Sequence, residues 1–158
     1  MGIAELQEAL GAHRLLLVDT SVFSYHLSDH PLYAPLTAVI LAAIESGRVA
    51  GLTSTVTVAE ILTLPAQAGD PRAMQDYELF LTGFPNLHLA PLDVPLARET
   101  ALVRAATGLR MPDAVQVAAA RLYGADAIVT NDHRWAARVS APAVYLLDTY
   151  LEQSKAGL

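Results

Sequence analysis

Cysteine is absent from the 158-residue sequence. Its absence excludes a disulfide scaffold, a thiol nucleophile and a cysteine-ligated zinc or iron–sulfur centre, and it is typical of a cytoplasmic protein. Long apolar runs are missing too: Ala38–Ile44 is far shorter than the ~18 residues that a membrane span needs. The first residues lack the basic-then-apolar pattern of an export signal. We therefore expect a protein of the cytoplasm that does not enter a membrane.

Charged residues are scarce, at 16% of the sequence, and the acidic excess gives a net charge of −6. This balance does not suit a protein that coats nucleic acid through bulk electrostatic attraction. It does not exclude a nuclease, because an acidic metal-binding centre carries negative charge that bound cations offset. Except for Lys155, the basic residues are arginines, the better side chains for paired contacts to phosphate.

Hydrophobic residues make up 53% of the sequence, and a single domain of this length buries roughly 68–70% of its unfolded surface. Strands are expected at Leu15–Val18, Arg48–Leu52, Asn86–Ala90, Ala127–Thr130 and Ala143–Leu147. Helices are expected at Ala4–Ala12, Ser21–Leu27, Leu36–Glu45, Thr57–Leu64, Ala73–Leu81, Pro95–Ala106 and Pro112–Tyr123, with a loop at Pro65–Pro71. Glycines that favour a helix end follow four of them, at Gly47, Gly83, Gly108 and Gly124. The alternation predicts a three-layer α/β fold, with a central, mainly parallel sheet flanked by helices.

Four carboxylates stand at comparable places in this pattern. Asp19 and Asp132 follow strands, whereas Glu60 and Asp113 fall in the first turns of helices. In an open parallel sheet these positions face one edge, where the ligand crevice forms. We therefore expect the four side chains to lie near one another.

Each acid also has an ordinary structural interpretation. Asp19 and Asp132 are suitable helix N-caps, Thr57 and Glu60 match a capping box, and Asp113 behind a proline complements a helix dipole. Together, however, four converging carboxylates repel one another unless a cation is present. Oxygen ligands without cysteine or histidine favour Mg²⁺ or Mn²⁺. Such a cluster suits metal-assisted phosphodiester hydrolysis.

The residues around these acids form an ordered set of motifs: Val18–Phe23, Ala59–Ile61, Pro112–Ala114 and Gly124–Asp132. The set, which extends from Leu15 to about Asp148, resembles the PIN-domain ribonucleases, and the VapC-type toxins of toxin–antitoxin pairs in particular. The resemblance implies a PIN fold and a Mg²⁺- or Mn²⁺-dependent endoribonuclease that hydrolyses RNA.

The resemblance also implies roles and partners. Asp19, Glu60, Asp113 and Asp132 match the family's catalytic and metal-binding acids, and Thr20, Thr130 and Asn131 match the polar residues that support them. The implied partners are RNA, a cognate antitoxin that covers the acidic cleft, and a second copy of the chain. The nuclease domain is expected over residues 14–150, between an N-terminal extension (1–13), expected to be helical, and a C-terminal tail (151–158). The extension departs from the family, whose first strand begins almost at the initiator methionine.

Several functional assignments remain open. Arg110, Arg134 and Arg138 are candidates for RNA phosphate contacts, the last two because a spacing of four places them on one helix face. His133 is a candidate general base, although an exposed polar side chain is the simpler interpretation. The alternatives to a toxin are a housekeeping PIN nuclease without an antitoxin and a non-catalytic PIN scaffold that binds a partner. The four intact acids favour a nuclease.

Overall fold

A computed structural model describes the backbone of residues 2–156 and the side chains of residues 2–151. Within these residues the strands are β1 (Leu15–Val18), β2 (Ala50–Ser54), β3 (Leu87–Ala90), β4 (Ala127–Thr130) and β5 (Ala143–Leu146). The helices are α1 (Ile3–Gly11), α2 (Thr20–Leu27), α3 (Ala34–Glu45), α4 (Thr55–Gln67), α5 (Pro71–Gly83), α6 (Val94–Thr107), α7 (Met111–Tyr123), α8 (His133–Arg138) and α9 (Leu147–Ala156).

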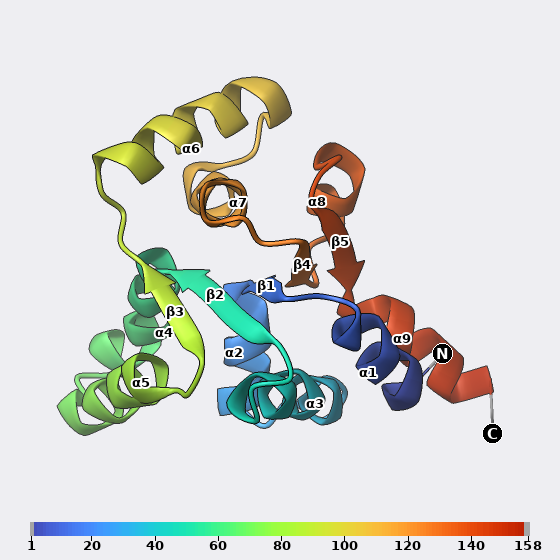
Figure 1. Ribbon diagram of the computed structural model, residues 1–158. Coiled ribbons are helices and arrows are strands. Elements are labelled where there is room, and N and C mark those ends of the chain that lie inside the picture. Colours follow the sequence, from blue (N-terminus) through green and yellow to red (C-terminus); the bar gives the residue numbers. More distant parts are fainter. Residues whose placement is uncertain (1, 157–158) are drawn as a thin grey trace.

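The five strands form one sheet in the order β3-β2-β1-β4-β5 (Figure 1). Every neighbouring pair is parallel, with Leu16 of β1 opposite Gly51 of β2 on one side and Ala127 of β4 on the other. The expected α/β fold with a parallel sheet between helices is therefore confirmed. Parallel strands are normally covered on both faces, and this explains why β1 and the first three residues of β4 are apolar.

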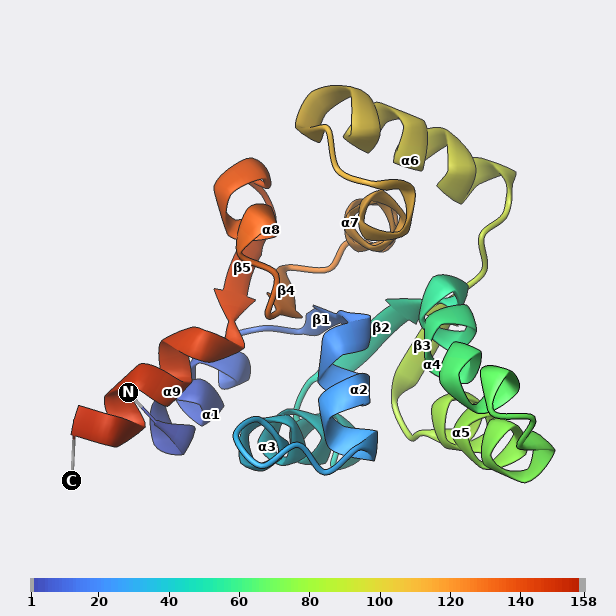
Figure 2. The same cartoon turned by 180° about the vertical axis from the view of Figure 1, so that it is seen from behind.

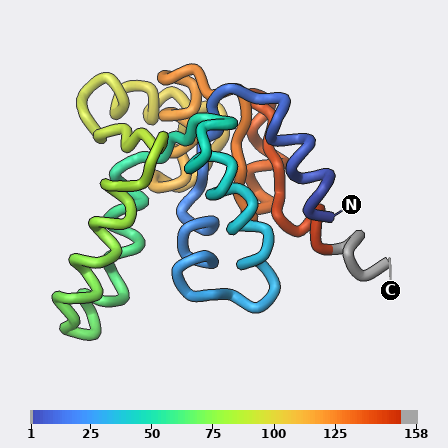
Figure 3. The backbone as a smooth tube through the Cα atoms, turned by 60° about the horizontal axis from the view of Figure 1, so that its bottom comes forward, coloured from blue at the N-terminus to red at the C-terminus, as the bar shows by residue number. Residues whose placement is uncertain are grey.

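Alternate residues of the central strands serve two separate cores, because successive side chains of a strand point to opposite faces. Leu16 and Val18 of β1 pack with residues of α1, α2, α3 and α9. Leu17 and Ile128 pack on the other face with α6, α7 and Trp135 of α8. Both views of the ribbon show α6, α7 and α8 on one side of the sheet and the remaining helices on the other (Figures 1 and 2). The backbone trace shows α4 and α5 extending side by side away from the body (Figure 3).

Helix ends agree with the sequence at three of the four glycines. Gly47, Gly108 and Gly124 have positive φ angles of 79°, 69° and 75°, the left-handed conformation that glycine adopts at low cost. Gly83 differs from these three, because it is the last residue of α5 rather than the residue after the helix end. The residue that follows it, Phe84, has an extended backbone conformation.

Three segments differ from the sequence-based expectation. Strand β2 runs two residues later than predicted, because the backbone N–H groups of Arg48 and Val49 donate to Ala43 at the end of α3. The predicted loop at Pro65–Pro71 is shorter, since α4 continues past Pro65 to Gln67. Helix α8 was implied only by the shared helix face of Arg134 and Arg138, and α9 was not predicted. Helix α9 extends to residue 156 of the expected tail, and residues 157–158 lie outside the described residues.

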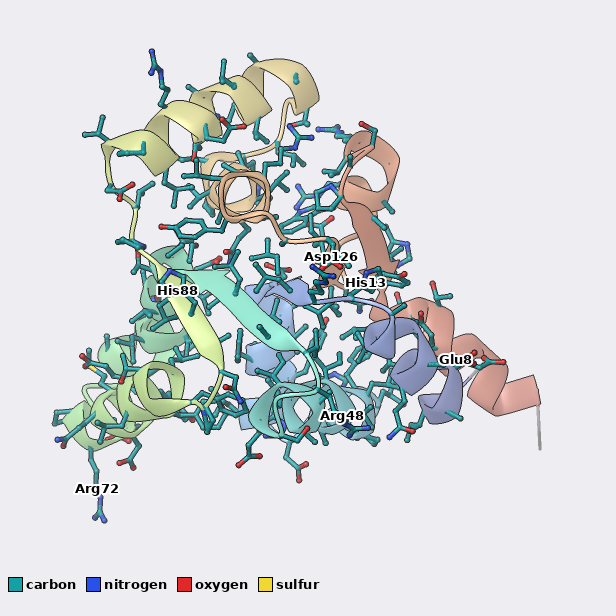
Figure 4. The ribbon with its side chains drawn as sticks, viewed as in Figure 1. Glu8, His13, Arg48, Arg72, His88 and Asp126 are labelled. Atoms are coloured by element: carbon teal, nitrogen blue, oxygen red, sulfur yellow. The ribbon has the colours of Figure 1, made fainter. Side chains whose placement is uncertain are left out.

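The expected N-terminal extension contains α1, whose Leu6 and Leu10 are fully buried in the core beneath the sheet. His13, which follows α1, contacts Asp126 ahead of β4 and Tyr145 of β5, with Nδ1–Oδ2 and Nε2–hydroxyl distances of 3.3 Å and 2.8 Å. Figure 4 shows His13 beside Asp126 where the chain enters β1. Residues 1–13 are thus integrated into the domain by side-chain contacts, apart from Met1, which lies outside the described residues.

Candidate active site

The sheet has a topological switch point at β1, because the chain continues to β2 on one side whereas β4 lies on the other. In open parallel sheets, ligands bind outside the carboxyl ends of the strands at such a point. Asp19 directly follows β1, and Asn131 and Asp132 directly follow β4. The N–H of Asp19 donates to the carbonyl of Val129 at 3.0 Å, which ties the two strand ends together.

Asp19 is both a helix cap and a buried acid. It holds the N-cap position of α2, and its Oδ1 accepts the backbone N–H of Thr20, the first residue of that helix, at 2.8 Å. Its Oδ2 accepts the hydroxyls of Ser21 at 3.1 Å and Thr130 at 2.7 Å. The residue is only 9% exposed, and this burial raises its pKa from 3.8 to about 6, although the three hydrogen bonds act to lower it. An N-cap needs neither such burial nor so many donors, so capping alone does not account for Asp19.

Glu60 is held by a chain of hydroxyls rather than by a capping box. Because β2 continues to Ser54, α4 begins at Thr55, so that Thr57 lies inside the helix and Glu60 lies beyond its first turn. The capping-box interpretation is therefore wrong. The hydroxyl of Thr20 donates to Oε1 of Glu60 at 2.8 Å and lies 2.9 Å from the hydroxyl of Thr57.

A buried glutamine on α7 supports this chain of hydroxyl groups. Gln116 is 1% exposed, and its Nε2 donates to Thr57 at 2.7 Å while its Oε1 accepts the N–H of Ser54 at 3.1 Å. Nε2 also lies 3.4 Å from the Thr20 hydroxyl. Sequence reasoning missed Gln116. One sequence signal could have found it: Gln116, three residues after Asp113, is a single amide among Ala, Val and Leu on a helix that was expected to be buried.

Asp113 and Asp132 share one guanidinium. Arg134 donates through Nε to both oxygens of Asp132 at 3.0 Å and 3.2 Å, and through Nη2 to Asp132 and, at 3.4 Å, to Asp113. These bonds lower the pKa of Asp132. Burial raises the pKa of Asp113, against the opposing charges of Arg110 and Arg134. Asp132 also caps α8 by accepting the N–H of Arg134 at 2.9 Å.

All four predicted acids line one open cleft of about 510 Å³. Its lining residues are Asp19, Thr20, Ser21, Ser24, Tyr25, Glu60, Asp113, Asn131, Asp132 and His133. Thr130 is fully buried behind Asp19. Of the three arginines predicted to contact RNA, Arg110 lies 3.5 Å from Asp113 and Arg134 binds the acids, whereas Arg138 donates to the carbonyl of Gly108.

Two lining residues that flank Asp132 in the sequence, Asn131 and His133, are held by Asp148 at the start of α9. His133 Nε2 lies 2.7 Å from Asp148, and the hydroxyl of Tyr33 donates to the same carboxylate at 2.6 Å. Asn131 accepts the N–H of Asp148 at 3.0 Å. The hydroxyl of Tyr33 has the largest effect on the pKa of Asp148 and lowers it, and the contacts of the carboxylate with His133 and the Asn131 amide act in the same direction. Asp148 was also missed, because no local pattern connects it to residues 115 positions earlier in the chain.

The donor set of the cleft fits a divalent cation. Its acids offer only hard oxygen atoms, the ligands that Mg²⁺ and Mn²⁺ prefer. Oδ1 of Asp19 accepts one of the three hydrogen bonds to this carboxylate and keeps acceptor capacity for a further ligand. Among the side chains that the structure describes, no three acids or histidines stand close enough to hold an ion as they are now arranged. The Arg134 guanidinium occupies the pair Asp113–Asp132 instead.

These features define an α/β protein with an acidic cleft at the switch point of its sheet. The family model for the PIN domain matches residues 16–141. The chain therefore belongs to the PIN domain family, a family of nucleases. A search of curated protein sequences gave no significant match.

Solved structures share this fold. VapBC2 from Rickettsia felis bound to a promoter DNA fragment is 14% identical, with a TM-score of 0.66 over 84% of this chain and 98% of that one. A toxin–antitoxin complex from Klebsiella pneumoniae is 17% identical, with a TM-score of 0.62 over 84% and 97%. FitAcB from Neisseria gonorrhoeae is 22% identical, with a TM-score of 0.57 over 84% and 97%. Among the described residues, no helix combines the length and the apolarity that crossing a membrane requires.

Proposed function

We propose that the protein is a Mg²⁺- or Mn²⁺-dependent endoribonuclease that hydrolyses RNA phosphodiester bonds in the cytoplasm. One observation carries the proposal: Asp19, Glu60, Asp113 and Asp132 come from four separate elements yet line the same cleft. Carboxylates at such density repel one another, and a cation relieves this cost. PIN-domain membership supports the nuclease chemistry.

In this proposal Asp19 and Asp113 are the principal metal ligands, and Glu60 and Asp132 complete the set directly or through water. A divalent cation held there would activate a water molecule and stabilise the charge that develops on the leaving oxygen. The chain's own task is to hold the ligands in place. Thr130 and Thr20 do so by donating to Asp19 and Glu60 at 2.7 Å and 2.8 Å.

Asn131 is proposed to support the part of the site next to Asp132. Its amide is fixed by the N–H of Asp148 at 3.0 Å and lies 3.5 Å from the Tyr25 hydroxyl. Such outer contacts orient the groups that line a metal site and tune its affinity. We assign no proton transfer to His133, whose ring is bound to Asp148 at the rim of the cleft.

Purified protein should cleave RNA in the presence of Mg²⁺ or Mn²⁺, and a chelator should stop the reaction. The variant Asp113→Asn, prepared in the same way, controls for contaminating nucleases, because it removes a proposed ligand while the rest of the surface is kept. Cleavage that persists in excess chelator, or that is equal in the variant, overturns the metal mechanism. A protein that binds RNA or a partner without cutting under any of these conditions is the non-catalytic scaffold instead.

We further propose that the nuclease is the toxin of a toxin–antitoxin pair and forms a homodimer. The support is that the Klebsiella neighbour is a toxin–antitoxin complex and the Rickettsia neighbour is VapBC2 bound to promoter DNA. An antitoxin that covers the acidic cleft would present a basic side chain, which the negative field of the acids attracts.

Co-purification from the native host and sedimentation of the isolated chain test these two partners. A small DNA-binding protein encoded beside this chain and recovered with it supports the toxin. Its absence from both the genome neighbourhood and the purified material supports a housekeeping nuclease. Sedimentation that finds only a monomer overturns the homodimer.

A further inference from the structure

Arg134 makes an unusual set of contacts for a surface arginine. It stands on the first turn of α8, and its guanidinium reaches Asp132 through Nε and Nη2 and Asp113 through Nη2. The two carboxylates belong to different helices, since Asp113 lies on the first turn of α7 and Asp132 caps α8. One guanidinium therefore bridges two of the four acids of the cleft.

This bridge and a bound cation need the same oxygen atoms. The oxygen that Asp113 turns toward Arg134 is Oδ2, and both oxygens of Asp132 accept from the same guanidinium. The acid side chains are mostly screened from water, with exposed fractions of 16% for Asp113 and 24% for Asp132. Charge-assisted, paired contacts of this kind are roughly twice as strong as neutral hydrogen bonds. A cation that binds through these oxygen atoms must displace them.

Among the side chains that the structure describes, none supplies such a counter-ion to the other pair of acids. Asp19 accepts only neutral donors, from Thr20, Ser21 and Thr130. Glu60 accepts the hydroxyl of Thr20. Arginine contacts thus fall on one side of the cleft, and Arg110, 3.5 Å from Asp113, adds to them.

We propose that Arg134 is an internal counter-cation: it holds Asp113 and Asp132 in the metal-free protein, and a divalent cation binds by displacing it. The inference rests on the proposed function and deepens it, because it makes activation of the nuclease a competition between a tethered guanidinium and the free ion. The side chain is 46% exposed, so it has open solvent to move into. The contact raises the cation concentration at which the site fills.

The test is Mn²⁺ binding to the full chain. The protein is first freed of metal by chelator treatment and gel filtration, and binding is then measured by isothermal titration calorimetry. Arg134→Gln should bind Mn²⁺ about tenfold more tightly than the wild type, because the competing charge-assisted bonds are gone. Arg134→Lys, which keeps the charge but loses the planar fork, should fall between them. Arg138→Gln is the matched control. It removes one positive charge a single turn further along α8, and the side chain that it removes donates to the carbonyl of Gly108.

The outcomes separate this inference from the proposed function. If Arg134→Gln binds Mn²⁺ no more tightly than Arg138→Gln while Asp113→Asn abolishes binding, the counter-cation role is wrong and the metal site stands. If neither the wild type nor any variant binds Mn²⁺, both fail. Binding by Arg134→Gln that the wild type lacks supports both.

A second measurement follows the unchanged protein during Mg²⁺ addition and needs the variant only to assign one resonance. The Nε–H resonance of Arg134, identified by its loss in Arg134→Gln, should move on addition of Mg²⁺, whereas that of Arg138 should stay. An Arg134 resonance that is unaffected at Mg²⁺ concentrations which fill the site contradicts displacement.

Discussion

Thr130 donates its buried hydroxyl to Oδ2 of Asp19 across 2.7 Å, from β4 to the end of β1. The two residues are 111 positions apart in the sequence, and this bond fixes the carboxylate at the switch point of the sheet. It satisfies a buried charge without neutralising it, because a hydroxyl carries no positive charge. The consequence is an acid that is oriented for a ligand while its burial still raises its pKa.

Replacement of Asp19 by asparagine separates capping from catalysis. Asparagine is nearly as good an N-cap as aspartate but a far poorer ligand for hard cations. We expect Asp19→Asn to lose cleavage by more than about 100-fold, since even outer contacts of a metal site are worth about 10–100-fold, and to keep or raise its metal-free stability. Asp113→Asn should behave in the same way.

Thermal melts with and without Mg²⁺ check this prediction. Stabilisation by the ion follows RT ln(1 + [L]/Kd) and should shrink in both variants. Asp76→Asn, at an exposed position of α5, is the matched control. Full activity together with a full Mg²⁺-dependent shift in the two variants would show that Asp19 and Asp113 are caps.

Stability without metal should depend on pH through Asp19. Its pKa is about 6 in the folded protein and near 3.8 in the unfolded chain, so the folded state binds more protons between these values. Its contribution is complete below pH 3.8 and is lost as the pH rises through about 6, a change of about 3 kcal/mol at most. Burial of Asp113 acts in the same direction. The lowered pKa values of Asp132 and Asp148 act below about pH 4, outside this window.

Urea unfolding in chelator at pH 4.5 and pH 7 measures this dependence. Asp19→Asn lacks the titrating group, so its free energy of unfolding should exceed that of the wild type increasingly toward pH 7. The two proteins share the same histidines, so the effect of histidine titration cancels in the difference between their free energies of unfolding. A difference that is the same at both pH values would mean that Asp19 is not the buried acid described here.

Gln116→Leu tests the buried hydroxyl chain. The substitution keeps most of the side-chain volume but leaves the N–H of Ser54 without its acceptor and Thr57 without its donor. We expect a loss of about 1–3 kcal/mol per unsatisfied group and slower cleavage, because Thr20 no longer holds Glu60 firmly. Urea unfolding and cleavage rates measure both effects, with Gln75→Leu at an exposed position of α5 as control. Unchanged stability and activity in Gln116→Leu would contradict this role.

Residues of α1 should matter for folding although they lie far from the cleft. Leu6 is fully buried in the core beneath the sheet, and Leu6→Ala should cost about 2–5 kcal/mol of stability. Ile3, which is 43% exposed, provides the control, since Ile3→Ala leaves a much smaller cavity. Urea unfolding of the two variants measures this difference. Similar free energies of unfolding for Leu6→Ala and Ile3→Ala would mean that α1 is not part of the core.

Much of the fold followed from local sequence. The apolar runs at β1 and β4 predicted buried parallel strands, and glycines at Gly47, Gly108 and Gly124 marked helix ends that the structure has. Family motifs placed the acids in order. These features could be predicted because they depend on neighbouring residues: a strand buried on both faces must be apolar throughout, and a left-handed helix end favours glycine.

Contacts between distant segments decided the rest. Thr57 reads as a helix cap in the sequence, but the register of β2 moves the start of α4 and places it beneath Thr20. Gln116 and Asp148 gained their roles only from partners brought to them by the folded sheet. Arg134 reads as a phosphate-binding residue, yet the turn of α8 brings it onto Asp132 and Asp113. Residue type and spacing determine which groups are available, whereas the pairing of charges depends on distances that only the tertiary structure sets.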